Sequence, residues 1–262
     1  MRIHVLASGS SGNATVVDGS HGAVLIDCGL SKKTLLARFV QVGFDPGRLR
    51  AVFITHEHSD HVSGLGVCLR GLTKLGLDLK VFANEPTVAA AAVFEEKGVR
   101  GKREAVQTGD TINVAGMRIL SFATSHNAAS PQGFRIEADG QALGYLTDSG
   151  HVPAEASELL LDCNLLALES NHDREALRTG PYPPFLKALI SSDQGHLAND
   201  QAAQTLGTLL NNRLQAVVGM HLSRNNNTPD LARAALVSTL AQHDHPAQVF
   251  IADQFKPLTI EL

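Results

Sequence analysis

The chain has 262 residues, of which 44% are hydrophobic and 18% charged, as in an ordinary folded globular protein. Its formal net charge of −4 excludes a general electrostatic attraction to nucleic acid, so a polyanion would need a local binding site. Its three cysteines are far apart and odd in number, which argues against a disulfide framework. The sequence shows neither a signal-peptide pattern nor a run of ~20 apolar residues. We therefore expect a cytoplasmic protein with no membrane partner.

The first part of the chain predicts three short strands joined by Gly- and Ser-rich turns: residues 3–7, 14–18 and 23–27. The turn after the first strand contains Ser10 and Asn13, which offer polar groups to an anion, although an ordinary hairpin loop has the same composition. Asp27 closes the third strand, where it either supports a metal-binding histidine or caps the next helix. That helix is predicted to begin at Ser31.

The stretch from Val52 to His61 combines an apolar strand with four side chains that bind metals: His56, His58, Asp60 and His61. If the strand continues through the histidines, His56 and His58 point to the same side, because alternate residues of a strand do. A turn after them would present Asp60 and His61 to a second point nearby. Imidazole nitrogens and carboxylates are ligands of divalent cations such as zinc. The alternative is a solvated histidine-rich turn.

The rest of the chain alternates strands with helical patterns, which indicates helices that cover a sheet. The predicted strands are 80–83, 111–114, 118–123, 133–138, 142–147, 165–168, 216–220, 249–252 and 258–260. Helices are predicted after His61, after Pro86, at 200–210 with Asn199 as the cap, and from Pro229. Asp139-Gly140 is typical of a hairpin turn. Three further residues each follow a predicted strand: His126, Asp148 and His221. A single histidine or aspartate at such a position is usually a cap or a turn residue.

The Thr-His-x-His-x-Asp-His run resembles the signature of the metallo-β-lactamase superfamily. The resemblance implies an α/β fold, the four-layered αββα metallo-β-lactamase sandwich, as a single domain over residues 1–262. It implies three more ligands, each directly after a strand, and the sequence supplies His126, Asp148 and His221 in the expected order. The segment between Asp148 and His221 is too short for the inserted β-CASP cap domain of the RNA-processing nucleases.

By this resemblance two divalent metal ions are bound, zinc or manganese, with iron as a third option. The superfamily's pattern assigns His56, His58 and His126 to one ion, Asp60, His61 and His221 to the other, and Asp148 to both. Two such ions share a hydroxide that attacks the substrate. The diiron flavoproteins of the superfamily have a glutamate in place of His58, and several zinc β-lactamases have a cysteine ligand. Neither feature is present, so the ligand set favours hydrolases of phosphodiesters or thioesters.

The segment from Gly195 to Ala203 is similar to one in the transfer-RNA 3′-processing nucleases, where a histidine opposite the metals contacts the scissile phosphate. His196 would then be the electrophile or the general acid, and Asp60 the second catalytic residue. The alternative for His196 is a surface residue beside a helix cap. More of the chain resembles the bacterial YycJ/WalJ family, which is exonuclease-like. The matching segments are Ser8–Asn13, Glu169–Asp173, Tyr182-Pro183, Gly195–Leu197 and His221–Asn227. Ala198 replaces the family's usual serine.

Glu169 and His172 follow another predicted strand, close to the expected metals. Glu169 would orient a histidine and His172 would reach substrate phosphate, or both are structural groups. We expect a phosphodiesterase that acts on DNA as a 5′–3′ exonuclease-like enzyme. The alternatives are a small-molecule hydrolase of cyclic phosphodiesters or thioesters, which the lack of tryptophan favours, and a metal-binding sensor without activity. The possibility of a homodimer is left open.

Overall fold

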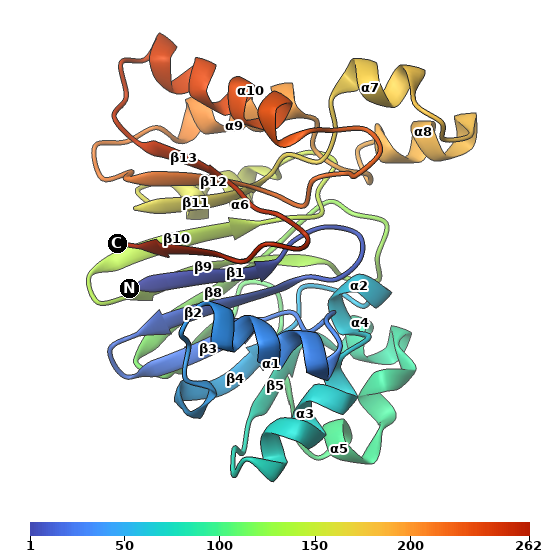
Figure 1. Ribbon diagram of the computed structural model, residues 1–262, viewed down its shortest axis with the longest axis vertical. Helices are drawn as coiled ribbons and strands as arrows, with labels where there is room; N and C mark the ends of the chain where they lie inside the picture. The colour runs from blue at the N-terminus through green and yellow to red at the C-terminus, as the bar shows by residue number, and fades with distance from the viewer.

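The computed structural model describes residues 1–262 and shows four layers (Figure 1). Two seven-stranded sheets face each other, and helices cover their outer faces. The strand order is β14-β1-β2-β3-β4-β5-β6 in the first sheet and β13-β12-β11-β10-β9-β8-β7 in the second. The αββα sandwich expected from the sequence is therefore confirmed.

The strands of the first sheet are β1 (Arg2–Ala7), β2 (Ala14–Gly19), β3 (Gly22–Ile26), β4 (Leu49–Phe53), β5 (Lys80–Ala83), β6 (Arg103–Ala105) and β14 (Leu258–Glu261). The helices of this half are α1 (Lys32–Gln41), α2 (Ser59–Val62), α3 (Leu65–Lys74), α4 (Glu85–Ala90) and α5 (Lys97–Arg100), with short 3₁₀ turns η1 (Pro46–Arg48) and η2 (Ala92–Glu95).

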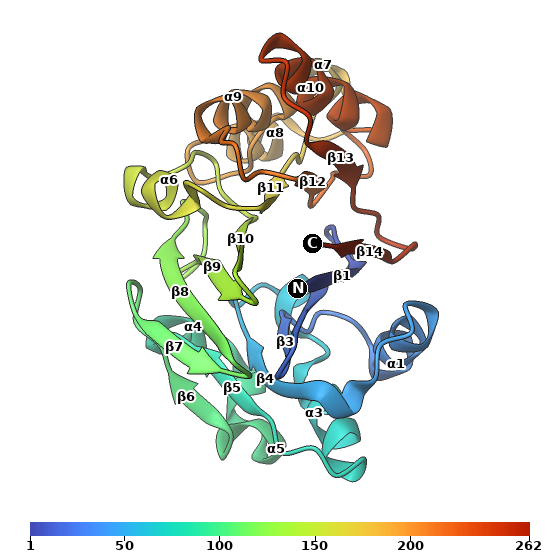
Figure 2. The ribbon, with the colours of Figure 1, turned by 90° about the vertical axis from the view of Figure 1, so that its left-hand side faces the viewer.

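The strands of the second sheet are β7 (Thr111–Val114), β8 (Met117–Ala123), β9 (Gln132–Ala138), β10 (Gln141–Leu146), β11 (Leu165–Glu169), β12 (Ala216–Met220) and β13 (Gln248–Ile251). Its helices are α6 (Ala154–Leu160), α7 (Arg174–Thr179), α8 (Pro184–Ile190), α9 (Asn199–Leu209) and α10 (Pro229–Gln242). Figure 2 shows α6, α9 and α10 outside the second sheet and α1, α3 and α5 outside the first.

Three clusters of buried apolar side chains form the contacts between the four layers. The central cluster joins the sheets, with Phe53 of β4 and Phe134 of β9 in edge-to-face contact at 5.7 Å between ring centroids. A second cluster joins the first sheet to α1 and α3, and a third joins the second sheet to α6, α9 and α10. Burial of this apolar surface is the main favourable term in folding.

Strand direction brings several loops to one edge of the sandwich. Strands β3 and β4 are parallel, as are β10, β11 and β12. β1 and β8 are each two antiparallel pairings away from a member of these groups, so they run in the same direction as it does. The carboxyl ends of all these strands therefore lie at the same edge, as in other sheets with parallel strands.

Two local predictions are wrong. Strand β4 ends at Phe53, so His56 and His58 lie in the loop after it. Their side chains therefore do not point to the same side because of strand geometry, as the sequence had suggested. The reason is that the buried Asp27 carboxylate accepts hydrogen bonds from the Thr55 backbone N–H and hydroxyl, which turns the chain out of the sheet. Asn199 is the first residue of α9 and does not cap it.

Other local predictions are confirmed. Asp139 and Gly140 both have positive φ, as a two-residue hairpin turn requires. Ser31 and Thr228 cap α1 and α10. The three cysteines are free and buried. No helix has both the length and the apolar character that crossing a membrane requires.

The contact between the sheets generates a stability prediction. Phe134→Ala removes a fully buried ring from the central cluster. We expect it to lower the free energy of unfolding by about 3–5 kcal/mol, because a large cavity remains in the core. Urea denaturation followed by circular dichroism measures this. Val40→Ala on α1, where the side chain is 80% exposed, is the control and should change stability by about 0.5 kcal/mol or less. Equal stability of both variants would contradict the assignment of the central core.

Candidate metal centre

Three polar residues at strand ends share an unusual backbone conformation. Asp27, Asp148 and His221 follow β3, β10 and β12 and have φ values of 59°, 56° and 53°. Residues other than glycine rarely adopt this left-handed region, because the Cβ atom crowds the backbone. Such strain is typical of functional sites. Here it turns each chain sharply at the edge where the sheets meet.

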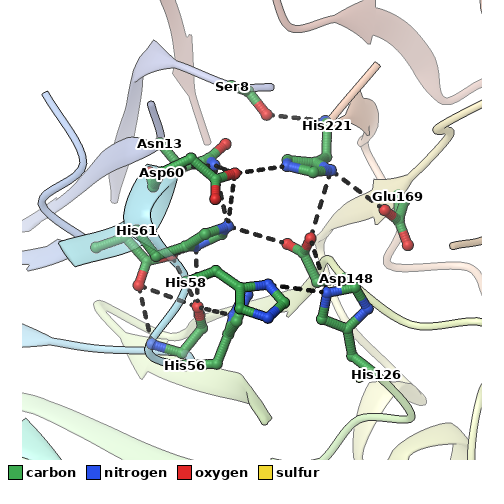
Figure 3. Close-up of polar contacts among 12 residues, drawn as sticks. Ser8, Asn13, His56, His58, Asp60, His61, His126, Asp148, Glu169 and His221 are labelled. Atoms are coloured by element: carbon green, nitrogen blue, oxygen red, sulfur yellow. Dashed lines mark hydrogen bonds and ion pairs between the residues drawn. The ribbon is translucent and has the colours of Figure 1, made fainter. Parts of the chain in front are cut away.

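The first cluster of potential ligands is made by His56, His58 and His126, whose nearest side-chain nitrogens lie within 4.8 Å of one another. His58 Nδ1 is 3.3 Å from His126 Nε2. The first two come from the loop after β4 and the third from the loop after β8, so the cluster joins the two sheets (Figure 3).

The second cluster is made by Asp60, His61 and His221. The Asp60 Oδ2 atom is 3.3 Å from His61 Nε2 and 3.4 Å from His221 Nε2. Asp60 and His61 lie on the single turn of α2, so the turn expected after His58 is present as a helix. This cluster also joins the two sheets, because His221 follows β12.

Asp148 lies between the clusters. Its Oδ2 atom is 3.4 Å from His61 Nε2, and its Oδ1 atom is 3.5 Å from His221 Nδ1 and 3.9 Å from His126 Nε2. The carboxylate is almost fully buried. The structure thus brings all seven predicted ligands together around one point, with Asp148 in reach of both clusters.

The hydrogen bonds behind the histidines fit metal binding. His126 Nδ1 donates to the Gly195 carbonyl at 2.8 Å, and His58 Nε2 donates to the Asn127 carbonyl at 3.0 Å. His61 Nδ1 is 2.7 Å from the Asp27 carboxylate. Because a carbonyl can only accept, the N–H lies on the outer nitrogen and the inner nitrogen keeps its lone pair for a cation.

Two buried atoms at the centre have no hydrogen-bond partner: His56 Nε2 and Asp148 Oδ2. Leaving such groups unpaired in a folded protein is costly, and metal coordination removes that cost. The donor set of nitrogens and carboxylate oxygens is also the one that zinc and similar cations prefer. The residues present therefore fit divalent metal ions.

The electrostatics of the centre favour positive charge. Burial raises the pKa of Asp60, but hydrogen bonds from His221 and His61 outweigh it and hold that pKa well below its usual range. Burial lowers the pKa of His221, but Asp148, Asp60 and Glu169 raise it to about 10. Carboxylates that stabilise the positive charge of His221 so strongly also attract a metal cation, which displaces the proton from the histidine.

Asp27 and Asn13 form hydrogen bonds to residues of the second cluster. Asp27 is fully buried and bonds to His61 and Thr55. It does not cap the next helix, because Ser31 does. Asn13 Nδ2 lies 3.1 Å from Asp60 Oδ2 and 3.0 Å from His61 Nε2, and its Oδ1 accepts from the Gly9 N–H. The loop after β1 is therefore part of the metal edge.

A cavity of about 220 Å³ opens onto the clusters and holds the predicted catalytic residues. Its wall includes Asp60, His196 and Ser10. His196 Nδ1 is 2.6 Å from Glu169 Oε1, so the fully buried Glu169 orients the histidine. His196 and His126 rings are 4.8 Å apart between centroids. A larger cavity of about 700 Å³, at the far turns of the second sheet, contains no such cluster.

His172 lies outside this cavity. It lines a separate cavity of about 300 Å³ between α7 and α8, and burial lowers its pKa to about 4. The structure does not bring it together with the seven potential ligands.

Sequence reasoning missed part of the cavity wall. Leu186, Leu189 and Ile190 of α8 line it, as do Asn127 and Gln194. Pro183-Pro184 followed by apolar residues at helical spacing was the signal for α8. The carbonyl oxygens that orient His58 and His126 left no signal, because every residue has one.

Comparisons with known proteins agree with this geometry. Residues 23–221 match the family model described as a beta-lactamase superfamily domain. The chain is 38% identical over 245 residues to exodeoxyribonuclease WalJ of Streptococcus pneumoniae serotype 2, covering 92% of this chain and 88% of WalJ. It is 34% identical over 242 residues to exodeoxyribonuclease YycJ of Bacillus anthracis, covering 92% and 90%. Among solved structures, the metallo-beta-lactamase fold protein YhfI of Bacillus subtilis superposes with a TM-score of 0.74, at 16% identity and 99% coverage of both chains.

The position of Asp148 generates a prediction about metal content. Asp148→Asn should bind less metal than His126→Ala, because Asp148 reaches both clusters and supplies negative charge, whereas His126 belongs to one. Asparagine tolerates the left-handed backbone at this position, so the fold should be kept. Elemental analysis of the purified proteins measures the bound metal.

Asp139→Asn is the matched control, since Asp139 has φ 54° in a hairpin turn far from the metal edge. It should bind as much metal as the unchanged protein. Two metal ions per chain in Asp148→Asn would show that Asp148 does not join the clusters.

Proposed function

This chain belongs to the beta-lactamase superfamily and, within it, to the family of the exodeoxyribonucleases WalJ and YycJ, and from that premise we propose that it hydrolyses phosphodiester bonds of DNA with two divalent metal ions. The observation that carries the proposal is the pair of ligand clusters within reach of Asp148, beside His196, which belongs to neither of the two and is hydrogen-bonded to Glu169.

We propose that each of the two clusters binds one metal ion. His56, His58 and His126 would hold one ion, and Asp60, His61 and His221 the other, with Asp148 shared. Zinc or manganese suits this set of nitrogens and carboxylates, and iron is the third option. When bound, such ions lower the pKa of water and stabilise negative charge on phosphate oxygens. Asp60 faces the cavity as an ionised carboxylate, so it can also accept a hydrogen bond from the attacking water and orient it.

His196 is proposed to protonate the leaving oxygen. Its Nδ1 is held by Glu169, which leaves Nε2 as the ring nitrogen available to substrate. Burial raises the pKa of Glu169, but the neighbouring His196 and His221 keep it well below its usual range, so the carboxylate is ionised. The hydrogen bond to Glu169 holds the His196 ring in place, and histidine is a side chain that can give a proton to a leaving oxygen.

DNA is the proposed substrate because the two relatives that cover most of this chain are named exodeoxyribonucleases. A thioesterase needs the metals but has less need of a proton donor, since a thiolate leaves more easily than an alkoxide. The hydrogen-bonded Glu169–His196 pair therefore favours a substrate with a poor leaving group.

The role of His196 is tested by two substrates. His196→Ala should keep its metal ions but cleave DNA about 10²–10⁴-fold more slowly, the usual share of a positioned proton donor. The loss should be much smaller for bis(p-nitrophenyl) phosphate, whose leaving group departs without a proton. Rates on both substrates, with metal content measured alongside, give the answer.

His21→Ala is the control, because His21 is exposed and lies outside the metal cavity. It should cleave both substrates at the parental rate. An equal loss on both substrates in His196→Ala would assign His196 a structural role, and no loss would remove it from the mechanism.

A further inference from the structure

The pocket between α7 and α8 carries a concentration of positive charge. Its volume is about 300 Å³, and its wall includes three cationic side chains, Arg174, Arg178 and Lys187, but no carboxylate. The chain as a whole has a net charge of −4, so this pocket differs in sign from the rest of the molecule. A concave site with one sign of charge favours ligands of the opposite sign. The pocket therefore suits an anion.

The charges of this pocket are only partly neutralised by the protein. Lys187 Nζ donates to the Arg178 carbonyl at 2.8 Å and is paired with no carboxylate. Arg174 contacts Asp200 only through its Nε atom, so its terminal nitrogens make no hydrogen bond. Arg178 is paired with Glu175 on the same helix. Lys187 and Arg174 therefore keep N–H groups that can donate to the oxygens of an anion.

His172 is the buried polar group of the pocket. It lines the pocket although it is only 1% exposed, and its Nδ1 atom has no hydrogen-bond partner. Its backbone is fixed, since the His172 carbonyl accepts from the Asn199 N–H at 2.8 Å. Buried polar atoms are nearly always hydrogen-bonded in folded proteins, so an unpaired one beside a pocket points to a ligand. An anion held by the cations would also contact this imidazole.

The two helices that form the pocket are held together. Figure 1 shows α7 and α8 beside each other at one end of the layer that covers the second sheet. Lys187 of α8 is bonded to the carbonyl of Arg178 on α7. The segment between the helices is fixed to the loop after β12, because Asn225 Nδ2 donates to the Tyr182 hydroxyl at 2.9 Å. The pocket is therefore formed before any ligand binds.

Helix α8 separates the pocket from the metal cavity. Leu186, Leu189 and Ile190 line the metal cavity, whereas Lys187 and Ser191 line the pocket. An α-helix with its side chains is about 10–12 Å across. A DNA strand carries one phosphate per about 3.4 Å of its axis. A strand that is cut at the metal centre therefore has further phosphates, a few nucleotides from the cut, at a distance that matches the pocket.

We propose that the pocket between α7 and α8 is an anion site that binds a phosphate group of the DNA substrate, a few nucleotides from the bond that is cut. Lys187, Arg174 and His172 contact this phosphate, and α8 keeps it apart from the metal ions. The inference rests on the proposed function and adds a second point of contact with the same substrate. Phosphate contacts set the register of a protein on DNA, so this one positions the bond to be cut at the metal centre.

Binding of cleavage-resistant DNA to the metal-loaded protein tests the inference. The probes are two duplexes with phosphorothioate linkages, one with phosphate and one with hydroxyl groups at its 5′ ends. Lys187→Gln should weaken binding about tenfold, a loss typical of one hydrogen bond to a charged group. The slope of log affinity against log salt concentration should become shallower by about 1, because one phosphate contact is lost. Titrations at several salt concentrations measure both quantities.

Three further variants separate charge from structure. His172→Leu should also weaken binding but leave the salt slope unchanged, because a ring with a pKa of about 4 is uncharged at neutral pH. Lys187→Arg keeps the positive charge and should restore most of the binding. Lys74→Gln removes an exposed lysine from α3 and is the matched control, which should bind normally. Equal thermal stability and metal content show that the variants are folded.

The two duplexes identify the source of the phosphate. If a terminal phosphate occupies the pocket, the unchanged protein binds the 5′-phosphate duplex more tightly, and Lys187→Gln removes that preference. If an internal phosphate occupies it, Lys187→Gln weakens the binding of both duplexes equally. Either result supports the anion site.

Two outcomes would overturn the inference. One is that Lys187→Gln binds both duplexes as tightly as Lys74→Gln does. The other is weaker binding with an unchanged salt slope, which would give Lys187 a structural role. Failure of the proposed function looks different, since the unchanged protein would then cleave no DNA at all in the presence of zinc or manganese.

Discussion

The structure depends on one buried carboxylate between two clusters of histidines. Asp148 lies within 4 Å of ring nitrogens from both halves of the chain, and one of its oxygens has no hydrogen-bond partner. Removing such a group from water is expensive unless opposite charge accompanies it. The packed layers of the sandwich hold the Asp148 carboxylate in place. Divalent cations fit between the two clusters and supply the opposite charge. Folding and metal binding are therefore expected to stabilise each other.

The position of each ligand follows from the sheets. Parallel strands end at one edge, and the left-handed residues Asp27, Asp148 and His221 turn the chain there. Rigid strands and short loops keep the ligands in place, which is what a metal site needs for precise geometry. The outer hydrogen bonds then select which histidine nitrogen faces the centre. Glu169 does the same for His196, so a single buried carboxylate links this proposed proton donor to His221.

Much of this was predictable from the sequence, because the chemistry is concentrated in few residues. The run from His56 to His61 and the order of His126, Asp148 and His221 predicted a set of potential ligands, and the structure brings these side chains together. The strand assumed to carry His56 and His58 was wrong, since a contact between Asp27 and Thr55 made by tertiary folding ends β4 early. The carbonyls of Gly195 and Asn127 could not be found, because backbone groups have no residue signature.

The most direct test of the account is a metal titration of the ion-depleted protein during which DNA cleavage is followed. With zinc or manganese added stepwise, we predict that two ions bind per chain and that cleavage rises as the second binds, because both clusters and the shared Asp148 are then filled. Full cleavage in the presence of excess chelator, or saturation of activity at one ion per chain, would contradict the two-ion centre.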